Sequence, residues 1–409
     1  MPDANHYVVI GNGIAGTTAA DTLRKNDEDC RITLITNEPY PLYNRVALPP
    51  ALKLKTPESK LFMKTMDWHE QRRICFLHST TVTGVDFETR TVVTDQGQEH
   101  VYDKLLVATG GSPNHVEVPG ADADGVCYFQ LLDDTKDILR RIPAAKDAVS
   151  IGGSYIAYEL AEAFQERGLN VSWLIRGPRF LHRVLDEDGG LLVDTIARKH
   201  GVNMIYNDTA ESIEADAKGH VTGVVSKGKA RLPGDIVGCG LGLHYNYGFL
   251  PQGQIEIDYG ILTNQFLETS VPHVYSAGDI AQFYDRDVDT HYTMGTWASA
   301  TAHGRVAALN MGGVREAVKD VRAYTSTLFD SRMTVIGATP EIRPDIESVS
   351  ATAFEGPEPK KWNYRRLFFY EGRLVGAVLI GDMKSKVDLV NVIRSKKPVW
   401  EDRASLLHL

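Results

Sequence analysis

Cysteine is scarce in this sequence. Only four cysteines occur in 409 residues, and they lie far apart, at Cys30, Cys75, Cys127 and Cys239. None of them forms a C-x-x-C motif, which excludes a local zinc site or a dithiol redox site of that kind. We therefore expect four thiols without a redox role and no bound metal, although distant cysteines can still meet in the folded chain.

Long hydrophobic runs and excess positive charge are also missing. No stretch reaches the roughly 18 apolar residues that suggest a membrane-spanning helix, and the first apolar run, 7–10, leads into glycines rather than a signal core. The formal net charge of −9 argues against nucleic-acid binding, since phosphate contacts need clustered Lys and Arg. We expect a soluble, cytoplasmic protein with no membrane span, for which a positively charged protein partner stays open.

The composition that is present indicates a folded α/β protein. Hydrophobic residues make up 43% of the chain and charged residues 24%, with 36 glycines. These proportions are ordinary for globular domains and wrong for a disordered chain or a coiled coil. The length of 409 residues predicts roughly two to three domains at about 150 residues each.

A strand, a glycine loop and a helix open the chain. Tyr7–Ile10 reads as the strand, 11–16 (Gly-Asn-Gly-Ile-Ala-Gly) as the loop and 17–25 as the helix. A second strand is expected at Arg31–Ile35, followed by Glu38. This order of elements around G-x-G-x-x-G predicts a dinucleotide-binding unit, without distinguishing FAD from NAD.

Each glycine of this loop has a physical role. Gly11 permits the tight turn, Gly13 lets a pyrophosphate approach the backbone, and Gly16 lets the helix pack close to the strand. The helix N-terminus offers unpaired N–H groups and partial positive charge to the phosphates. Glu38 then fits as an acceptor for ribose hydroxyls.

A degenerate second copy begins near the middle of the chain. The strand 148–151 leads into residues 152–157 (Gly-Gly-Ser-Tyr-Ile-Ala), a helix, and a further strand at Val171–Ile175. Ala157 is an accepted variant of the last glycine, and Ser154 is small enough to leave a phosphate approach open. Two such units, followed by further motifs, predict one domain inserted into another.

Two further strand ends carry small residues. Tyr102–Val107 ends in Ala108, Thr109 and Gly110, and Val274–Ala277 ends in Gly278 and Asp279. An acidic residue at such a strand end can accept a hydrogen bond from a polyol or orient N–H groups toward a phosphate.

Together these motifs resemble the two-dinucleotide-domain flavoproteins, the FAD-dependent pyridine-nucleotide oxidoreductases. Glu38-Pro39 with Tyr-Asn-Arg at 43–45 resembles, more narrowly, rubredoxin and ferredoxin reductases and the flavin module of assimilatory nitrite reductases. The segment 297–304 is similar to the one that runs along the flavin in that group, and 372–382 is similar to its C-terminal domain. The likeness covers essentially the whole chain.

The resemblance implies which residues hold FAD. They lie in the first glycine loop, after the second strand, at the two strand ends and at the start of the 297–304 segment: Gly11, Gly13, Ile14, Ala15, Gly16, Glu38, Arg45, Ala108, Thr109, Gly110, Gly278, Asp279 and Trp297. Relatives carry a lysine shortly after the position of Arg45. In this sequence the aligned position is Pro50, and the nearest lysine is Lys53. His303 stands where relatives often have Gln, and we expect it to be structural.

The resemblance also places the nicotinamide beside the second loop. Binding residues there would be Gly152, Ser154, Tyr155, Ile156, Ala157, Arg176 and Arg179. Tyr155 is a candidate gate over the flavin, and Glu159, one turn later, is a second candidate catalytic residue. The strand Val171–Ile175 ends in Ile175, where an NADH-selective site has an acidic residue, and Arg176 follows it. We therefore expect a preference for NADPH over NADH.

The expected function is electron transfer from NAD(P)H through FAD to a small iron-sulfur or rubredoxin-type protein, or to a partner enzyme subunit. An NAD(P)H oxidase or quinone reductase and a non-catalytic FAD-binding assembly subunit are the alternatives, and a homo-oligomer stays open. We expect an α/β fold with two Rossmann-like domains, one inserted in the other, plus an α+β C-terminal domain. The boundaries are 1–115 with 245–315 for FAD, 116–244 for NAD(P)H and 316–409 for the C-terminal domain.

Overall fold

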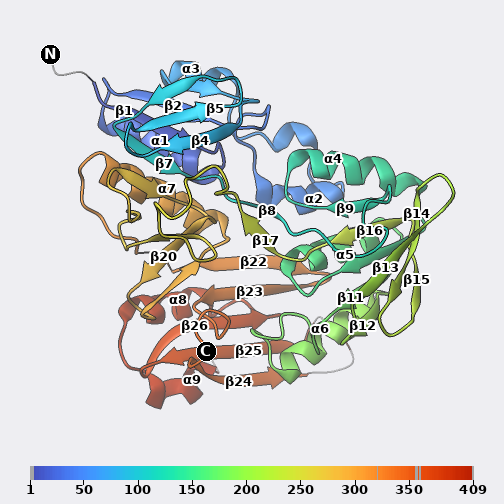
Figure 1. Cartoon of the computed structure of the whole chain (residues 1–409). Helices are drawn as coiled ribbons and strands as arrows, with labels where there is room; N and C mark the ends of the chain where they lie inside the picture. The colour runs from blue at the N-terminus through green and yellow to red at the C-terminus, as the bar shows by residue number, and fades with distance from the viewer. Residues whose placement is uncertain (1–3, 320, 355–357, 359–360, 408–409) are drawn as a thin grey trace. The chain divides into compact units, whose positions relative to one another are not determined.

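The computed structural model describes residues 4–319, 321–354, 358 and 361–407 (Figure 1). The chain divides into two compact units, which are described one at a time. The first comprises 1–44, 59–112 and 244–322, and the second comprises 45–58, 113–243 and 323–409. Two short strands, β8 (Gly111–Pro113) and β17 (Leu243–Tyr245), lie where the chain passes from one unit to the other. The division into three domains expected from the sequence stays a prediction.

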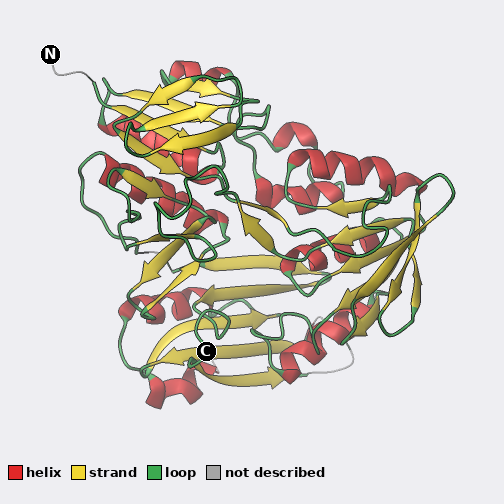
Figure 2. Cartoon of the chain, viewed as in Figure 1, coloured by secondary structure: helices red, strands yellow, loops and turns green. Residues whose placement is uncertain are grey.

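A five-stranded parallel sheet forms the centre of the first unit (Figure 2). Its order is β3 (Cys75–Leu77), β2 (Arg31–Ile35), β1 (His6–Ile10), β7 (Lys104–Val107) and β19 (Val274–Ser276). Helix α1 (Ile14–Asn26) follows β1, and α7 (Trp297–Met311) packs against it. The two helices approach so closely that a Cβ on Gly304 would lie 2.1 Å from the carbonyl oxygen of Ala15.

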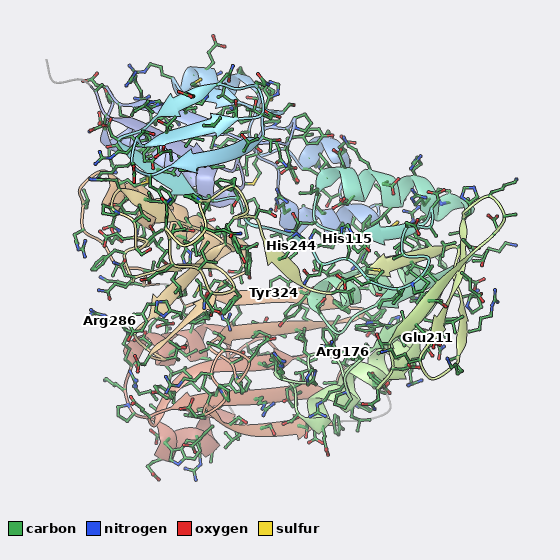
Figure 3. All side chains as sticks on the ribbon, viewed as in Figure 1. His115, Arg176, Glu211, His244, Arg286 and Tyr324 are labelled. Carbon is green, nitrogen blue, oxygen red and sulfur yellow. The ribbon has the colours of Figure 1, made fainter. Side chains whose placement is uncertain are left out.

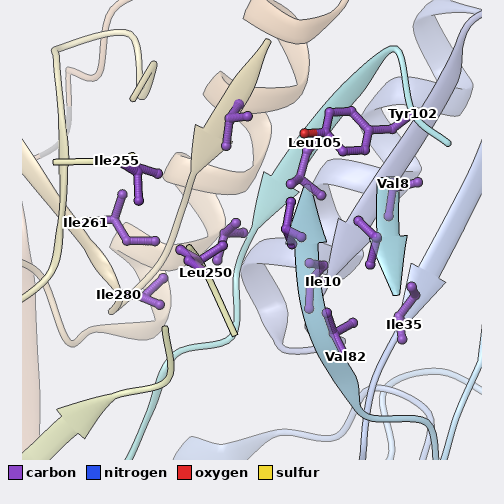
Figure 4. Packing of buried hydrophobic residues seen from close by; sticks show 14 residues of the cluster. Val8, Ile10, Ile35, Val82, Tyr102, Leu105, Leu250, Ile255, Ile261 and Ile280 are labelled. Carbon is purple, nitrogen blue, oxygen red and sulfur yellow. The ribbon is translucent and has the colours of Figure 1, made fainter. Parts of the chain in front are cut away.

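Apolar residues of the strands form the core of this unit. Figure 4 shows Val8, Ile10 and Ile35 of the parallel sheet packed with Leu105 and with side chains of later segments, such as Leu250 and Ile280. Two three-stranded sheets and a short helix, α3 (Asp67–Gln71), complete the unit. One sheet contains β4 (Val82–Asp86), β5 (Thr91–Thr94) and β6 (Glu99–Val101). The other contains β18 (Ile261–Thr263), β20 (Ala281–Asp285) and β21 (Thr290–Thr293).

A second five-stranded parallel sheet begins the other unit. Its order is β12 (Asn203–Tyr206), β11 (Asn170–Ile175), β10 (Asp147–Ile151), β16 (Ile236–Cys239) and β9 (Val126–Tyr128). Helices α4 (Leu132–Arg141), α5 (Tyr155–Glu166) and α6 (Glu187–Lys199) accompany it, with the antiparallel sheet β13 (Ala210–Ala215), β14 (Val221–Ser226) and β15 (Arg231–Pro233). Helix α2 (Leu48–Leu52) packs on α4 and α5.

The C-terminal part of the second unit is an antiparallel sheet. Its order is β22 (Ala323–Leu328), β23 (Ser331–Gly337), β26 (Arg373–Ile380), β25 (Asn363–Tyr370) and β24 (Glu347–Ala353), followed by α8 (Lys386–Ser395) and α9 (Arg403–Leu407). A hairpin turn at Glu371-Gly372 joins β25 to β26, and both residues have positive φ, +49° and +72°, as a type I′ turn requires. Within the described ranges, no helix is long and apolar enough to cross a bilayer.

Candidate functional site

The first glycine loop is a turn into which only glycine fits at two positions. Gly11 has φ +108°, its N–H donates to the carbonyl of Ile35 at 2.8 Å, and a Cβ there would lie 2.3 Å from the carbonyl oxygen of Ala108. A Cβ on Gly16 would lie 1.9 Å from the carbonyl oxygen of Gly11. Side chains at either position would force the backbone apart.

Gly13 differs, because it borders open space. It is the N-cap of α1, and as a glycine it provides no side-chain hydrogen bond to the end of this helix. A Cβ at Gly13 would meet no described atom within 4 Å. The first N–H groups of a helix have no intrahelical partner, so this end of α1 offers donors and partial positive charge to an anion. A pyrophosphate such as that of FAD fits this cradle.

The two strand ends lie beside the same helix. The N–H of Ala108 donates to the carbonyl of Ile10 at 2.8 Å, and the Thr109 hydroxyl donates to the carbonyl of Asn246 at 2.8 Å. Gly278 has φ +79°, and a Cβ there would lie 3.2 Å from the Cβ of Ala15, in the first turn of α1. The carboxyl ends of β7 and β19 are therefore at the edge of the sheet where α1 begins, the edge at which such sheets bind ligands.

Three further expected FAD residues also belong to the first unit. Glu38 is half-buried three residues after β2 and accepts a hydrogen bond from the Tyr43 hydroxyl at 2.6 Å. Asp279 and Trp297, the first residue of α7, are half-buried as well. Arg45 belongs to the second unit and donates to the carbonyl of Gln130 at 3.1 Å.

His303 has the surroundings of a structural residue. Its side chain is fully buried in α7, neither ring nitrogen has a hydrogen-bond partner within the described chain, and its ring meets that of Phe283 edge to face at 5.1 Å. Burial lowers the pKa of this imidazole to about 4, so the ring is neutral at neutral pH.

The second glycine loop makes the same turn with a different cap. Gly152 has φ +130° and donates to the carbonyl of Leu174 at 2.9 Å, and a Cβ there would lie 2.1 Å from the carbonyl oxygen of Gly240. Ser154 is the N-cap of α5: its hydroxyl accepts from the N–H of Ala157 at 3.4 Å and donates to the carbonyl of Gly240 at 2.7 Å. The serine thus occupies the position that Gly13 leaves open in the first loop.

The two expected catalytic residues meet at a third side chain. Tyr324 of β22, labelled in Figure 3, donates its hydroxyl to Glu159 Oε1 at 2.6 Å, and its ring packs edge to face on that of Tyr155, 4.8 Å between centroids. Glu159 is only 7% exposed, and burial raises the pKa of its carboxyl to about 7. Sequence reasoning did not single out Tyr324, because it lies far along the chain in another sheet.

A buried lysine–glutamate pair is present in the second unit. Lys53, just after α2, forms an ion pair with Glu162, whose side chain is fully buried, and its Nζ lies 3.5 Å from Glu166 Oε1. Glu162 also accepts from the Tyr158 hydroxyl at 2.5 Å and from the Thr327 hydroxyl at 3.0 Å. Lys53 lies three residues beyond Pro50, and Glu162 three beyond Glu159. Residues three apart share a helix face, a spacing that could have identified this partner.

The two arginines expected near the nicotinamide differ in their surroundings. Ile175, at the end of β11, is 1% exposed, and Arg176 directly after it is exposed (Figure 3). Arg179 is half-buried and donates from Nε to the carbonyl of Leu185 at 3.0 Å. Arg176 is therefore available to a ligand, whereas Arg179 also holds its own loop.

The chain matches known families over most of its length. Residues 5–304 match the model for pyridine nucleotide-disulphide oxidoreductases, and 343–397 match the rubredoxin NAD⁺ reductase C-terminal domain. The chain is 28% identical over 404 residues to a nitrite reductase (NAD(P)H) of Bacillus subtilis, and 26% identical over 393 residues to an assimilatory nitrate reductase electron transfer subunit of that organism. Each alignment covers 96% of this chain but 48% and 49% of the respective relative, so the chain spans about half their length.

Solved structures agree with the fold. A ferredoxin reductase from Rhodopseudomonas palustris superposes with a TM-score of 0.89 at 24% identity, covering 98% of this chain and 97% of that one. This likeness confirms the expected α/β architecture. The family match confirms the expected enzyme class and FAD as cofactor, in a family whose members use NADH or NADPH. The chain belongs to the pyridine nucleotide-disulphide oxidoreductase family.

Proposed function

We propose that this chain is an FAD-dependent oxidoreductase that accepts hydride from NADPH and passes the electrons to a redox protein or a partner subunit. The observation that carries the proposal is the open N-terminus of α1 at Gly13, at the carboxyl edge of a parallel sheet, with a second glycine turn of the same geometry at Gly152. Bound FAD would supply the redox chemistry, and the chain supplies binding, orientation and electrostatics.

The residues divide between two dinucleotides. The proposed FAD residues are Gly11, Gly13, Ile14, Ala15, Gly16, Glu38, Arg45, Ala108, Thr109, Gly110, Gly278, Asp279 and Trp297. The proposed nicotinamide residues are Gly152, Ser154, Tyr155, Ile156, Ala157, Arg176 and Arg179, with Tyr155 and Glu159 as the catalytic pair. Tyr155 would cover the reacting rings, and the hydroxyl of Tyr324 orients the Glu159 carboxyl.

NADPH preference rests on the end of β11. A buried Ile175 replaces the carboxylate that would repel a 2′-phosphate, and the exposed guanidinium of Arg176 can bind one. Arg176→Ala should lower the ratio of kcat/KM for NADPH to that for NADH by roughly tenfold, the scale of one lost charge-assisted hydrogen bond. An unchanged ratio would reject this assignment.

The proposed acceptor is a small iron-sulfur or rubredoxin-type protein, or a partner enzyme subunit. The match of 343–397 to the rubredoxin NAD⁺ reductase C-terminal domain supports it. All four cysteines are free thiols, and the described residues hold no group of His, Cys, Asp or Glu that could bind a metal, so we place the one-electron centre outside these residues. We place the chain in the cytoplasm, where thiols such as the exposed Cys75 stay reduced.

Reoxidation of the reduced chain tests the acceptor. The FAD-loaded protein, reduced with NADPH, should be reoxidised slowly by oxygen and quickly by a rubredoxin or ferredoxin from the same cell. Reoxidation by oxygen as fast as by every redox protein tried would favour the oxidase alternative. Failure of both nicotinamides to bleach the flavin would favour the non-catalytic assembly subunit.

A further inference from the structure

The loop that carries Arg176 and Arg179 is held at its far end. It runs from 176 to 186, between β11 and α6, and Leu181 within it has φ +44°, a conformation that needs support from its surroundings. The N–H of Leu181 donates to the carbonyl of Gly153 at 3.3 Å. Arg179 closes the loop on itself by donating to the carbonyl of Leu185 at 3.0 Å.

A second guanidinium binds the adjacent carbonyl. Arg366 of β25 donates from Nη1 to the carbonyl of Val184 at 3.0 Å, so consecutive carbonyls of the loop, at 184 and 185, each accept from an arginine. Arg366 is itself oriented by Ser348 of β24, whose hydroxyl accepts from Nη2 at 2.8 Å and from Nε at 3.2 Å. The planar guanidinium is thereby fixed between the strand pair and the loop.

The same sheet also contacts the helix that follows the loop. Tyr364 of β25 is 2% exposed, and a Cβ on Gly189, in the first turn of α6, would lie 2.8 Å from its ring. Thr352 of β24 donates to Asp188 Oδ2 at 2.9 Å. The C-terminal sheet therefore holds both the end of the loop and the start of α6, within one compact unit.

We propose that Arg366 is a positioning residue for nicotinamide selectivity: by holding the Val184 carbonyl it fixes the loop in the conformation that presents Arg176 to a 2′-phosphate. The C-terminal sheet then contributes to NADPH recognition without touching the ligand. This inference rests on the proposed role of Arg176, and it adds a residue that lies 182 positions from the carbonyl it holds.

Two adenosine probes test the proposal on the FAD-loaded full-length chain. Arg366→Met, which keeps an unbranched apolar side chain but removes the donors, should raise the Kd of 2′,5′-ADP by about three- to tenfold, the range of one lost hydrogen bond. The Kd of 5′-AMP, which has no 2′-phosphate, should change less than twofold. KM for NADPH should rise with kcat nearly unchanged, and Arg366→Lys should recover part of the loss.

A second variant tests the proposal if Arg366→Met fails to fold, and a third variant is a matched control. Ser348→Ala removes the acceptor that orients Arg366 but changes neither the loop nor Arg366 itself. Like Arg366→Met, it should raise the Kd of 2′,5′-ADP. Thr352→Val removes a neighbouring contact of the same sheet with α6 and should leave the ratio of the two Kd values unchanged. Equal weakening of both probes by Arg366→Met, or no change in either, would overturn the proposal.

Arg176→Ala separates this inference from the proposal beneath it. If Arg176→Ala weakens 2′,5′-ADP binding but Arg366→Met does not, the role of Arg366 is wrong and NADPH recognition stands. If Arg176→Ala leaves 2′,5′-ADP binding unchanged, the role of Arg176 itself is wrong, and the inference drawn from it is overturned as well.

Discussion

The two glycine loops make the same turn, yet they present different helix ends. In each loop the first glycine has positive φ and lies against a carbonyl oxygen of a neighbouring segment, that of Ala108 for Gly11 and that of Gly240 for Gly152. At the middle position the loops diverge, since Gly13 leaves the end of α1 open and Ser154 caps α5 with its own hydroxyl.

This difference separates turn geometry from anion binding. The turn needs glycine because of φ and crowding, whereas the helix end can be left open for a ligand or filled by a side chain. An open end suits a cofactor that stays bound, because its phosphates supply the missing acceptors. A filled end suits a substrate that enters and leaves, since the helix stays capped between turnovers.

The largest effect is expected at the turns themselves. Gly11→Val should abolish FAD retention, because its Cβ would lie 2.3 Å from the Ala108 carbonyl oxygen and valine disfavours positive φ. The matched variant Gly152→Val should keep FAD and lose reduction by NADPH. Flavin content and anaerobic bleaching measure the two outcomes, and full FAD occupancy in folded Gly11→Val would reject the assignment of the first loop.

The next largest effect is on the pH dependence of stability, through the buried carboxyl of Glu159 in α5. Burial raises the pKa of Glu159 from 4.5 to about 7, so the folded chain keeps a proton that the unfolded chain loses between these values. The stabilisation that this proton provides is complete below about pH 4.5 and is lost as pH rises toward 7.

Glu159→Gln removes that pH dependence. The variant should match the wild type near pH 4.5 and exceed its unfolding free energy above pH 7 by up to about 3 kcal/mol. Denaturant unfolding at several pH values measures the difference. Parallel stability curves for the two proteins would show that the Glu159 carboxyl titrates normally.

Gly13→Ala should act mainly on cofactor binding. A Cβ there meets no described atom within 4 Å, so stability without FAD should fall by less than about 1 kcal/mol, the difference between glycine and alanine at an N-cap. The methyl group would occupy the cradle at the start of α1, and the Kd for FAD should rise about tenfold, or about 1.4 kcal/mol. Calorimetry on the FAD-free protein measures both quantities, and an unchanged Kd would place the pyrophosphate elsewhere.

Ser154→Gly should give the smallest effect, by making the second loop resemble the first. Stability should fall by only a few tenths of a kcal/mol, whereas Ser154→Ala should cost about 1 kcal/mol. Opening the helix end should lower KM for NADPH by about two- to threefold in the glycine variant and leave it unchanged in the alanine variant. A higher KM in Ser154→Gly would mean that the hydroxyl itself binds the substrate.

The sequence was most informative where function depends on backbone geometry. A short apolar strand, a glycine-rich run and a helix predicted each loop, and the first glycine of each loop has positive φ in the structure. Helix α1 begins at Ile14 instead of residue 17, because its first turn is part of the glycine loop.

Side-chain partners from distant segments could not be predicted. Tyr324 reaches Glu159 across 165 positions, and Arg366 reaches Val184 across 182, so no local pattern connects them. The sequence singles out Lys53 but not its partner Glu162, although Glu162 lies three residues beyond Glu159 on the same face of α5. Such contacts depend on how the sheets pack, which periodicity does not specify.

Anaerobic mixing of the FAD-loaded chain with each nicotinamide tests the central claim most directly. We predict that NADPH bleaches the flavin with a higher second-order rate constant than NADH, and that Arg176→Ala brings the two rates together by slowing NADPH alone. A flavin that neither nicotinamide reduces, or one reduced faster by NADH in the unmodified chain, would contradict the account.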